Sequence, residues 1–266
     1  MKIHTWGWER DGQGEAPDGD EWVAVSAGMY HGLALGADGS AAAWGSNTHG
    51  QLEVPEESGF QAIVCGLYHG LGLKADGSVA AWGWNRDGQC GAPAESDFVA
   101  VSAGSNHNVA LRADGSLAAW GWSHDGQCDV PGGKGFTAVA AGAWHNVALR
   151  EDGSIVAWGR DDDGRCNSPE GHDFVAVACG MHHSLALRED GRVVAWGRND
   201  DGQCDVPVDG HFVSIAAGGY HNLALDRGGA ITAWGWNRYG QCDAPAGKGF
   251  KVIAAGAWYS LALSAE

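Results

Sequence analysis

The chain lacks several features that would assign it to common classes of protein. It has only 16 lysine and arginine residues against 33 aspartate and glutamate residues, which gives a formal net charge of −17. Nucleic acids and anionic membranes recruit basic surfaces, so we expect neither as a partner. No apolar run is long enough to span a membrane. The first residues carry no apolar core of a signal peptide, so we expect none.

Motifs for catalysis or cofactor binding are also missing. The sequence has no nucleophile motif, no phosphate-binding glycine loop and no pair of acidic residues on a rigid element. The run Asp161–Asp163 precedes a glycine, as in a calcium loop, but its acids are consecutive rather than alternating. We therefore expect a protein that is not an enzyme and that uses no cofactor and no metal.

The sequence does contain a repeat of constant length. A Trp-Gly pair recurs every 38 residues, and seven periods make the full length of 266 residues. A fixed period of this size is typical of an array of similar supersecondary units. Because the repeat is unbroken, it favours a single domain over residues 1–266. The repeated tryptophans are Trp6, Trp44, Trp82, Trp120, Trp158, Trp196 and Trp234.

Each unit predicts four short strands and no helix. In one unit, residues 98–103, 107–112 and 117–120 form short apolar or alternating runs, and Asp114–Gly115 is a hairpin signal. Residues 127–130 form a fourth run that ends at a repeated proline, as an outer edge strand would. Seven such units predict an all-β fold, a seven-bladed β-propeller. The chain starts and ends within a unit, so a composite blade of residues 3–6 and 251–263 should close it.

The seven cysteines follow the same period. Five share one position and two share another, and the other units carry small or apolar residues there, so the thiols should pack as small core groups. Equivalent positions of adjacent blades usually lie beyond the roughly 7 Å Cα limit for a disulfide. Seven free thiols favour a cytoplasmic location. They are Cys65, Cys90, Cys128, Cys166, Cys179, Cys204 and Cys242.

The aromatic residues fall into two groups. Fourteen occupy two in-register layers that should pack between blades. The other eleven lie in or beside two loops of each unit, the turn before the repeated histidine and the loop after Trp-Gly. Antiparallel strand order places both loops at one end of the propeller. Tyrosine and tryptophan dominate binding hot spots, so this end should bind a partner, unless some of these rings cover blade junctions. The candidates are Trp8, Tyr30, Tyr68, Trp84, Trp122, Trp144, Tyr220, Trp236, Tyr239 and Trp258.

The same loops carry many charged residues, among them Asp163 and Asp201. Aromatic anchors with an acidic rim suit a protein partner that bears basic groups. Six histidines share one position, but a tyrosine replaces them in the last unit, so we favour a structural role in which each bonds backbone at a strand start. The non-repeated His49, His124 and His182 are better binding candidates.

The units resemble the regulator-of-chromosome-condensation repeat. Residues 104–111 and 82–89 carry its G-x-x-H-x-L-A-L and W-G-x-N-x-x-G-Q forms. Short units ending in Val-Pro or Ala-Pro are most similar to the branch of β-lactamase inhibitory protein II, with residues 256–263 the closest stretch. This resemblance implies secretion and a grip on a protruding loop-helix of a target enzyme. It places Trp144, Tyr220, Trp258, Asp163 and Asp201 on the gripping loops.

Four functions compete at this point. The first is a monomeric, protein-binding propeller, with enzyme inhibition as one form of binding. The second is a lectin-like module in which Trp8, Trp84, Trp122 and Trp236 each stack one sugar in its own blade. The third is a nucleotide-exchange factor, which the constant unit length opposes because no blade carries an inserted wedge. The fourth is a purely structural or engineered propeller.

Overall fold

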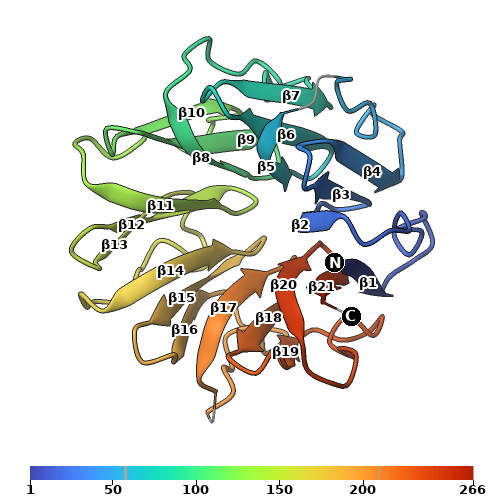
Figure 1. Ribbon diagram of the computed structural model, residues 1–266. Coiled ribbons are helices and arrows are strands. Elements are labelled where there is room, and N and C mark those ends of the chain that lie inside the picture. Colours follow the sequence, from blue (N-terminus) through green and yellow to red (C-terminus); the bar gives the residue numbers. More distant parts are fainter. Residues whose placement is uncertain (57–58, 209, 266) are drawn as a thin grey trace.

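A computed structural model describes residues 1–56, 59–208 and 210–265 of the chain. Within them, 21 strands form seven antiparallel, three-stranded sheets and no helix occurs. Figure 1 shows the sheets as blades around a central axis. The prediction of an all-β, seven-bladed β-propeller is therefore confirmed. Since the described residues include no helix, none of them forms a helical membrane span.

Six blades consist of three consecutive strands each. The first strand of every blade is innermost and packs against the first strands of its two neighbours. The six blades are β2 (Trp22–Ala27), β3 (His31–Gly36) and β4 (Ala41–Gly45); β5 (Phe60–Cys65), β6 (His69–Lys74) and β7 (Val79–Gly83); β8 (Phe98–Ala103), β9 (His107–Arg112) and β10 (Leu117–Gly121); β11 (Phe136–Ala141), β12 (His145–Arg150) and β13 (Ile155–Gly159); β14 (Phe174–Cys179), β15 (His183–Arg188) and β16 (Val193–Gly197); β17 (Phe212–Ala217), β18 (His221–Asp226) and β19 (Ile231–Gly235).

The seventh blade joins the two ends of the chain, as predicted. Its strands are β20 (Phe250–Ala255), β21 (Tyr259–Ser264) and β1 (Lys2–Gly7), and β1 pairs with β21 from Lys2↔Ser264 to Gly7↔Tyr259. The two termini lie close together beside this blade (Figure 1). The pairing gives β21 a neighbouring strand on the side that the end of the chain would otherwise leave open.

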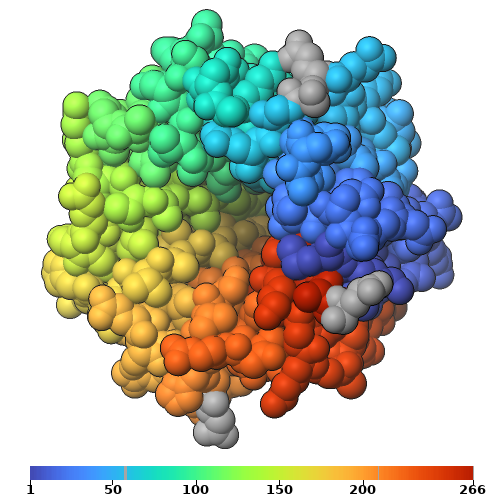
Figure 2. Space-filling model, in the orientation of Figure 1, coloured from blue at the N-terminus to red at the C-terminus, as the bar shows by residue number. Residues whose placement is uncertain are grey.

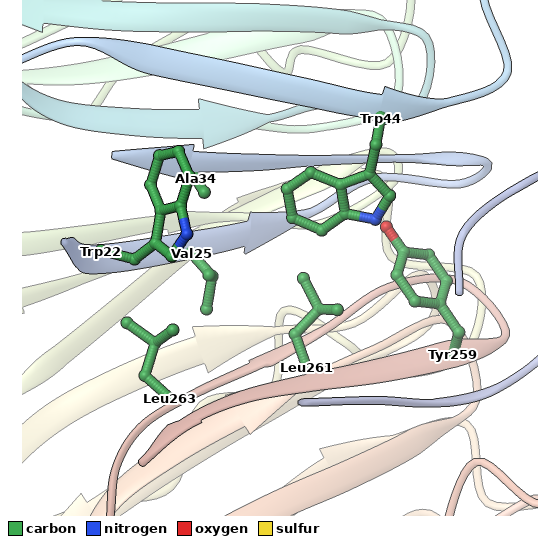
Figure 3. Packing of buried hydrophobic residues seen from close by; sticks show 7 residues of the cluster. All are labelled: Trp22, Val25, Ala34, Trp44, Tyr259, Leu261 and Leu263. Carbon is green, nitrogen blue, oxygen red and sulfur yellow. The ribbon is translucent and has the colours of Figure 1, made fainter. Parts of the chain in front are cut away.

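Two aromatic layers fill the spaces between blades. The phenylalanine that begins each inner strand is buried, and so is Trp22 at the same position of β2. Each repeated indole also donates a hydrogen bond to a main-chain carbonyl of the preceding blade, as from Trp82 Nε1 to Gln51 O at 3.0 Å. Figure 3 shows the packing beside the closing blade, where Leu261 and Leu263 meet the side chains of the next blade.

The fourth strand predicted for each blade is absent from the described residues, so this part of the prediction is wrong. Residues 127–130 begin in a tight turn in which Asp129 N donates to Gly126 O at 3.1 Å. The amide of Cys128 donates to the Ser123 side chain at 3.0 Å. Pro131 has no amide hydrogen at all. With the amides of Cys128 and Asp129 bonded within the loop, the segment forms no ladder with β10.

The inner strands surround a channel along the axis. Figure 2 views the molecule from the end that carries the chain termini, and the centre of this face is hollow. Within the channel lies a cavity of about 80 Å³, lined by small residues at the ends of the inner strands, such as Ala27 and Cys65. The turns that follow the inner strands, including Met29 and Leu67, lie at the end opposite the termini.

Candidate functional site

The two loop sets predicted to share one end of the propeller are joined by hydrogen bonds. In each blade the amide of the residue after Trp-Gly donates to the carbonyl of the residue before the repeated histidine position. Examples are Trp84 N to Tyr68 O at 2.9 Å and Trp8 N to Trp258 O at 3.0 Å. We call the surface formed by these fourteen loops the loop face. It lies at the opposite end from the chain termini.

Nine of the ten predicted aromatic side chains form one connected group on this face. Ring centroids of successive members lie 4.4–6.4 Å apart, and His49 and His182 link neighbouring members. Such separations are typical of interacting aromatic pairs. We call this group the aromatic belt: Trp8, Tyr30, Tyr68, Trp84, Trp144, Tyr220, Trp236, Tyr239 and Trp258.

Trp122 is the predicted aromatic residue outside the belt. Its ring stacks on His124 at 5.9 Å, and the side chain is 39% exposed. It nevertheless lies near Trp144 of the belt, because both line a pocket of about 490 Å³ together with Asn106 and Arg160. The pocket therefore extends the loop face beyond the belt.

An acidic residue recurs three positions after the residue that follows Trp-Gly. Five blades carry aspartate there, including the predicted Asp163 and Asp201. In four of them a buried glutamine two residues later fixes the loop, because its Oε1 accepts the aspartate amide at 2.9–3.0 Å. We call these five residues the acidic ring: Asp11, Asp87, Asp125, Asp163 and Asp201.

Arg165 is a residue of the site that sequence analysis missed. It replaces the buried glutamine in one blade, is itself only 2% exposed, and forms an ion pair with Asp163. The Asp163 carboxylate also lies 3.9 Å from His182 Nδ1. Burial, together with the charges of Arg165 and Arg198, lowers the pKa of His182 to about 4. His182 is therefore neutral at pH 7. The sequence signal for this residue is that Arg165 follows Gly164 where the other units have a glutamine after the glycine.

The six repeated histidines are structural, but they do not bond as predicted. Except for His31, each Nε2 meets a side chain at the start of the next blade's middle strand, as His69 meets Asn108 Oδ1 at 2.7 Å. The prediction of backbone partners for these rings is therefore wrong. Burial lowers the pKa of His69 to about 4. Among the described residues, no three His, Cys, Asp or Glu side chains are arranged to hold a metal ion.

The cysteines are free thiols, as their positions predicted. Burial raises the pKa of Cys90 to about 11 and that of Cys65 to about 12. A protonated thiol is a poor nucleophile and a poor metal ligand. Cys90 Sγ lies 3.3 Å from the carbonyl oxygen of Trp84, next to the belt. The cysteines therefore act as small packing groups beneath the loop face.

Comparison with known proteins identifies the family of these repeats. The model of the regulator of chromosome condensation (RCC1) repeat matches residues 22–51, 60–89, 98–127, 136–165, 174–203 and 212–241. No curated protein sequence matches the chain.

Several solved structures share the architecture. Prp20p from Saccharomyces cerevisiae is 18% identical, with a TM-score of 0.84 over 100% of this chain and 92% of that chain. Human WBSCR16 is 16% identical, with a TM-score of 0.81 over 99% and 98% of the two chains. The ectodomain of the Physcomitrella patens receptor kinase CR4 is 24% identical, with a TM-score of 0.74 over 87% and 67%. At these identities the likeness concerns the fold alone.

Proposed function

The chain belongs to the family of proteins built from the regulator of chromosome condensation (RCC1) repeat, and from this premise we propose that it is a non-enzymatic protein whose loop face binds a protein partner. The observation that carries the proposal is the aromatic belt. Nine tyrosine and tryptophan side chains from both loop sets gather on one face. Clusters of such rings supply large contact areas at low entropic cost and dominate protein interfaces.

The chemistry of the partner follows from charge. The acidic ring lies on the same face as the belt, and the whole chain has a net charge of −17. Complementary charge speeds encounter and excludes wrong partners, so the partner should present basic groups. Solved relatives also contact proteins: Prp20p was described with its binding to Gsp1p and histones, and yeast Prp20 was solved bound to Kap60.

Enzyme inhibition is the finer proposal. The repeat units resemble those of the β-lactamase inhibitor branch, and the residues on its gripping loops lie on the loop face. Trp144, Tyr220 and Trp258 belong to the aromatic belt, while Asp163 and Asp201 belong to the acidic ring. A convex loop of an enzyme, inserted toward the channel mouth, would contact all five.

Inhibition and direct binding measured against a panel of class A β-lactamases test this proposal. Trp258→Ala and Trp144→Ala should each weaken binding at least tenfold, since a central aromatic anchor contributes about 2 kcal/mol or more. Val175→Ala is the matched control, because Val175 is exposed on an inner strand outside the loop face. If none of the enzymes binds, inhibition of this class is excluded. If Val175→Ala weakens binding as strongly, the loop face is not the interface.

A carbohydrate ligand is the second candidate, and one observation favours it. Trp122 is an exposed platform beside the polar groups of Asn106, His124 and Asp125 in the 490 Å³ pocket. By contrast, Trp8, Trp84 and Trp236 contact rings of other loops, which opposes one independent sugar site in each blade. A glycan array with Trp122→Ala as the comparison tests the candidate. Binding that persists in the variant would exclude this pocket.

A further inference from the structure

Two loops from opposite ends of the chain meet on the loop face beside the closing blade. The loop after β1 contributes Trp8, and the loop after β19 contributes Trp236 and Tyr239. The centroids of Trp8 and Tyr239 lie 4.4 Å apart with an interplanar angle of 62°, and those of Tyr239 and Trp236 lie 5.1 Å apart at 83°. Edge-to-face contacts leave ring faces that the other rings do not cover, and Tyr239 remains 37% exposed.

A carboxylate lies beside these rings. Asp11 Oδ2 accepts hydrogen bonds from Trp8 Nε1 at 3.0 Å and from Gln13 Nε2 at 3.5 Å. Both donors are neutral, and none of the ion pairs among the described residues involves Asp11. The carboxylate therefore keeps its negative charge uncompensated. Burial raises the pKa of Tyr30, and Tyr68, Asp11 and Tyr239 add to the increase, so the carboxylate lies close to the belt.

The protein already places a cation against one of these rings. The guanidinium carbon of Arg10 lies 5.0 Å from the ring centroid of Trp8. This distance is within the roughly 6 Å range of cation–π attraction. Arg10 is an exposed side chain of the same loop. An exposed cation of the protein itself on an aromatic face beside a carboxylate shows what kind of group the cluster attracts.

The equivalent positions in other blades are less suitable. Asp87 lies three residues after Trp84, but its carboxylate accepts a bond from Asn106 Nδ2 at 2.9 Å. Asp125 lies three residues after Trp122, and its carboxylate is 3.3 Å from His124 Nδ1. Beside the closing blade, by contrast, three rings lie near a carboxylate that forms no ion pair among the described residues.

We propose that Trp8, Asp11, Trp236 and Tyr239 form a receptacle for one arginine or lysine side chain of the protein partner. The inference rests on the proposed function and specifies the group that the partner must present there. The aromatic faces attract the cation through their quadrupoles, and the carboxylate adds a direct ion pair. Arg10 occupies part of this position in the free protein and moves aside on binding.

A short cationic peptide tests the receptacle without knowledge of the partner. The probe is acetyl-Gly-Arg-Gly-amide, and the neutral control replaces arginine with citrulline. Binding is followed through the indole N–H signals of the ¹⁵N-tryptophan-labelled protein, with the Trp8 signal identified by its loss in Trp8→Leu. The arginine peptide should shift the Trp8 and Trp236 signals, whereas the citrulline peptide should not.

Three variants assign the contributions. Asp11→Asn and Trp8→Leu should each lower the affinity for the arginine peptide roughly three- to tenfold, as expected for loss of one exposed cation contact. Arg10→Gln should raise this affinity, because the Arg10 guanidinium no longer competes with the peptide for the ring of Trp8. Asp18→Asn, which removes an exposed carboxylate at the end opposite the loop face, should leave the affinity unchanged. The indole signals of the seven repeated tryptophans report whether each variant remains folded.

Two results would overturn the inference. One is equal binding of the arginine and citrulline peptides, and the other is unchanged affinity in both Asp11→Asn and Trp8→Leu. These results are separable from failure of the proposed function. A protein complex that depends on Trp258 but not on Asp11 or Trp8 would retain the function and reject the receptacle. If the peptide binds at Trp8 but the loop face binds no protein, the receptacle is retained and the proposed function is rejected.

Discussion

At the scale of single residues, two departures from the repeat match each other across the closing blade. In most blades a histidine ring bonds an asparagine or serine of the next blade. At the closing blade Tyr259 replaces the histidine and Gly32 replaces its partner. The Tyr259 hydroxyl instead donates to the carbonyl of His31. It lies beside the Trp44 indole (Figure 3), which also fills the space next to Gly32. The larger tyrosine is therefore tolerated because the facing side chain is missing.

This pairing predicts the effect of restoring the consensus at one position. Gly32→Asn should lower the free energy of unfolding by about 1–3 kcal/mol, because the new side chain overlaps Trp44. Adding Tyr259→His should recover part of the loss, since the pair then matches His107 and Asn146 in other blades. Urea unfolding of the two single variants and the double variant measures the coupling. Additive losses would show that the two positions are independent.

At the scale of elements, the segment after each third strand is a braced loop rather than a strand. One side chain holds it from within: Asn237 Oδ1 accepts the Cys242 amide at 2.8 Å, and Asn237 Nδ2 donates to Asp243 at 2.8 Å. Another blade uses Asp161 at the same position for the same amide bond. A carboxylate or amide oxygen thus replaces the strand neighbour that sequence analysis expected.

The brace can be removed from the loop that carries Trp236 and Tyr239. Asn237→Ala should lower the free energy of unfolding by about 1 kcal/mol, because it removes the acceptor of the Cys242 amide and a typical hydrogen bond contributes about that much. It should also weaken any ligand of this part of the loop face, because the rings lose their fixed position. The double variant Asn237→Asp with Asp243→Asn is the control, since it keeps the accepting oxygen and reproduces the acid and amide of Asp161 and Asn167 in another blade. Thermal unfolding and the Trp236 indole signal would show the two effects. Equal losses in both variants would contradict the role of the accepting oxygen.

At the scale of the whole molecule, the buried histidines make stability depend on pH. Burial lowers the pKa of His69, His107 and His183 to about 4 and that of His31 and His221 to about 3, and it lowers the pKa of His145 well below its usual value. The unfolded chain binds protons at these groups near pH 6.5, whereas the folded chain does not. Acid therefore favours the unfolded state.

We expect full stability above pH 6.5 and a progressive loss between pH 6.5 and about 4. Each buried histidine contributes up to about 1.4 kcal/mol per pH unit within this window. Urea unfolding at several pH values measures the slope. His69→Gln should reduce that slope by the amount that corresponds to about one bound proton, whatever its effect on absolute stability. A slope unchanged by this substitution would show that His69 does not titrate on unfolding.

The architecture of the propeller was predictable from the amino-acid sequence alone. The constant period set the number of blades, because each Trp-Gly marks the end of a third strand. The antiparallel order of the strands placed both loop sets at one end. It was therefore predictable that the loops carrying Trp84 and Tyr68 lie on the same face. The composite blade followed from a chain that starts and ends within a unit. These features depend on local periodicity, which a sequence displays directly.

The contacts between side chains of different blades, by contrast, were not predictable from the sequence. Trp8 and Tyr239 lie at opposite ends of the sequence and touch only because β1 pairs with β21. Trp122 stays outside the aromatic belt, although it occupies the same position of the repeat as Trp8, Trp84 and Trp236. Such contacts depend on distances across blade boundaries, and a repeat pattern holds no information about them.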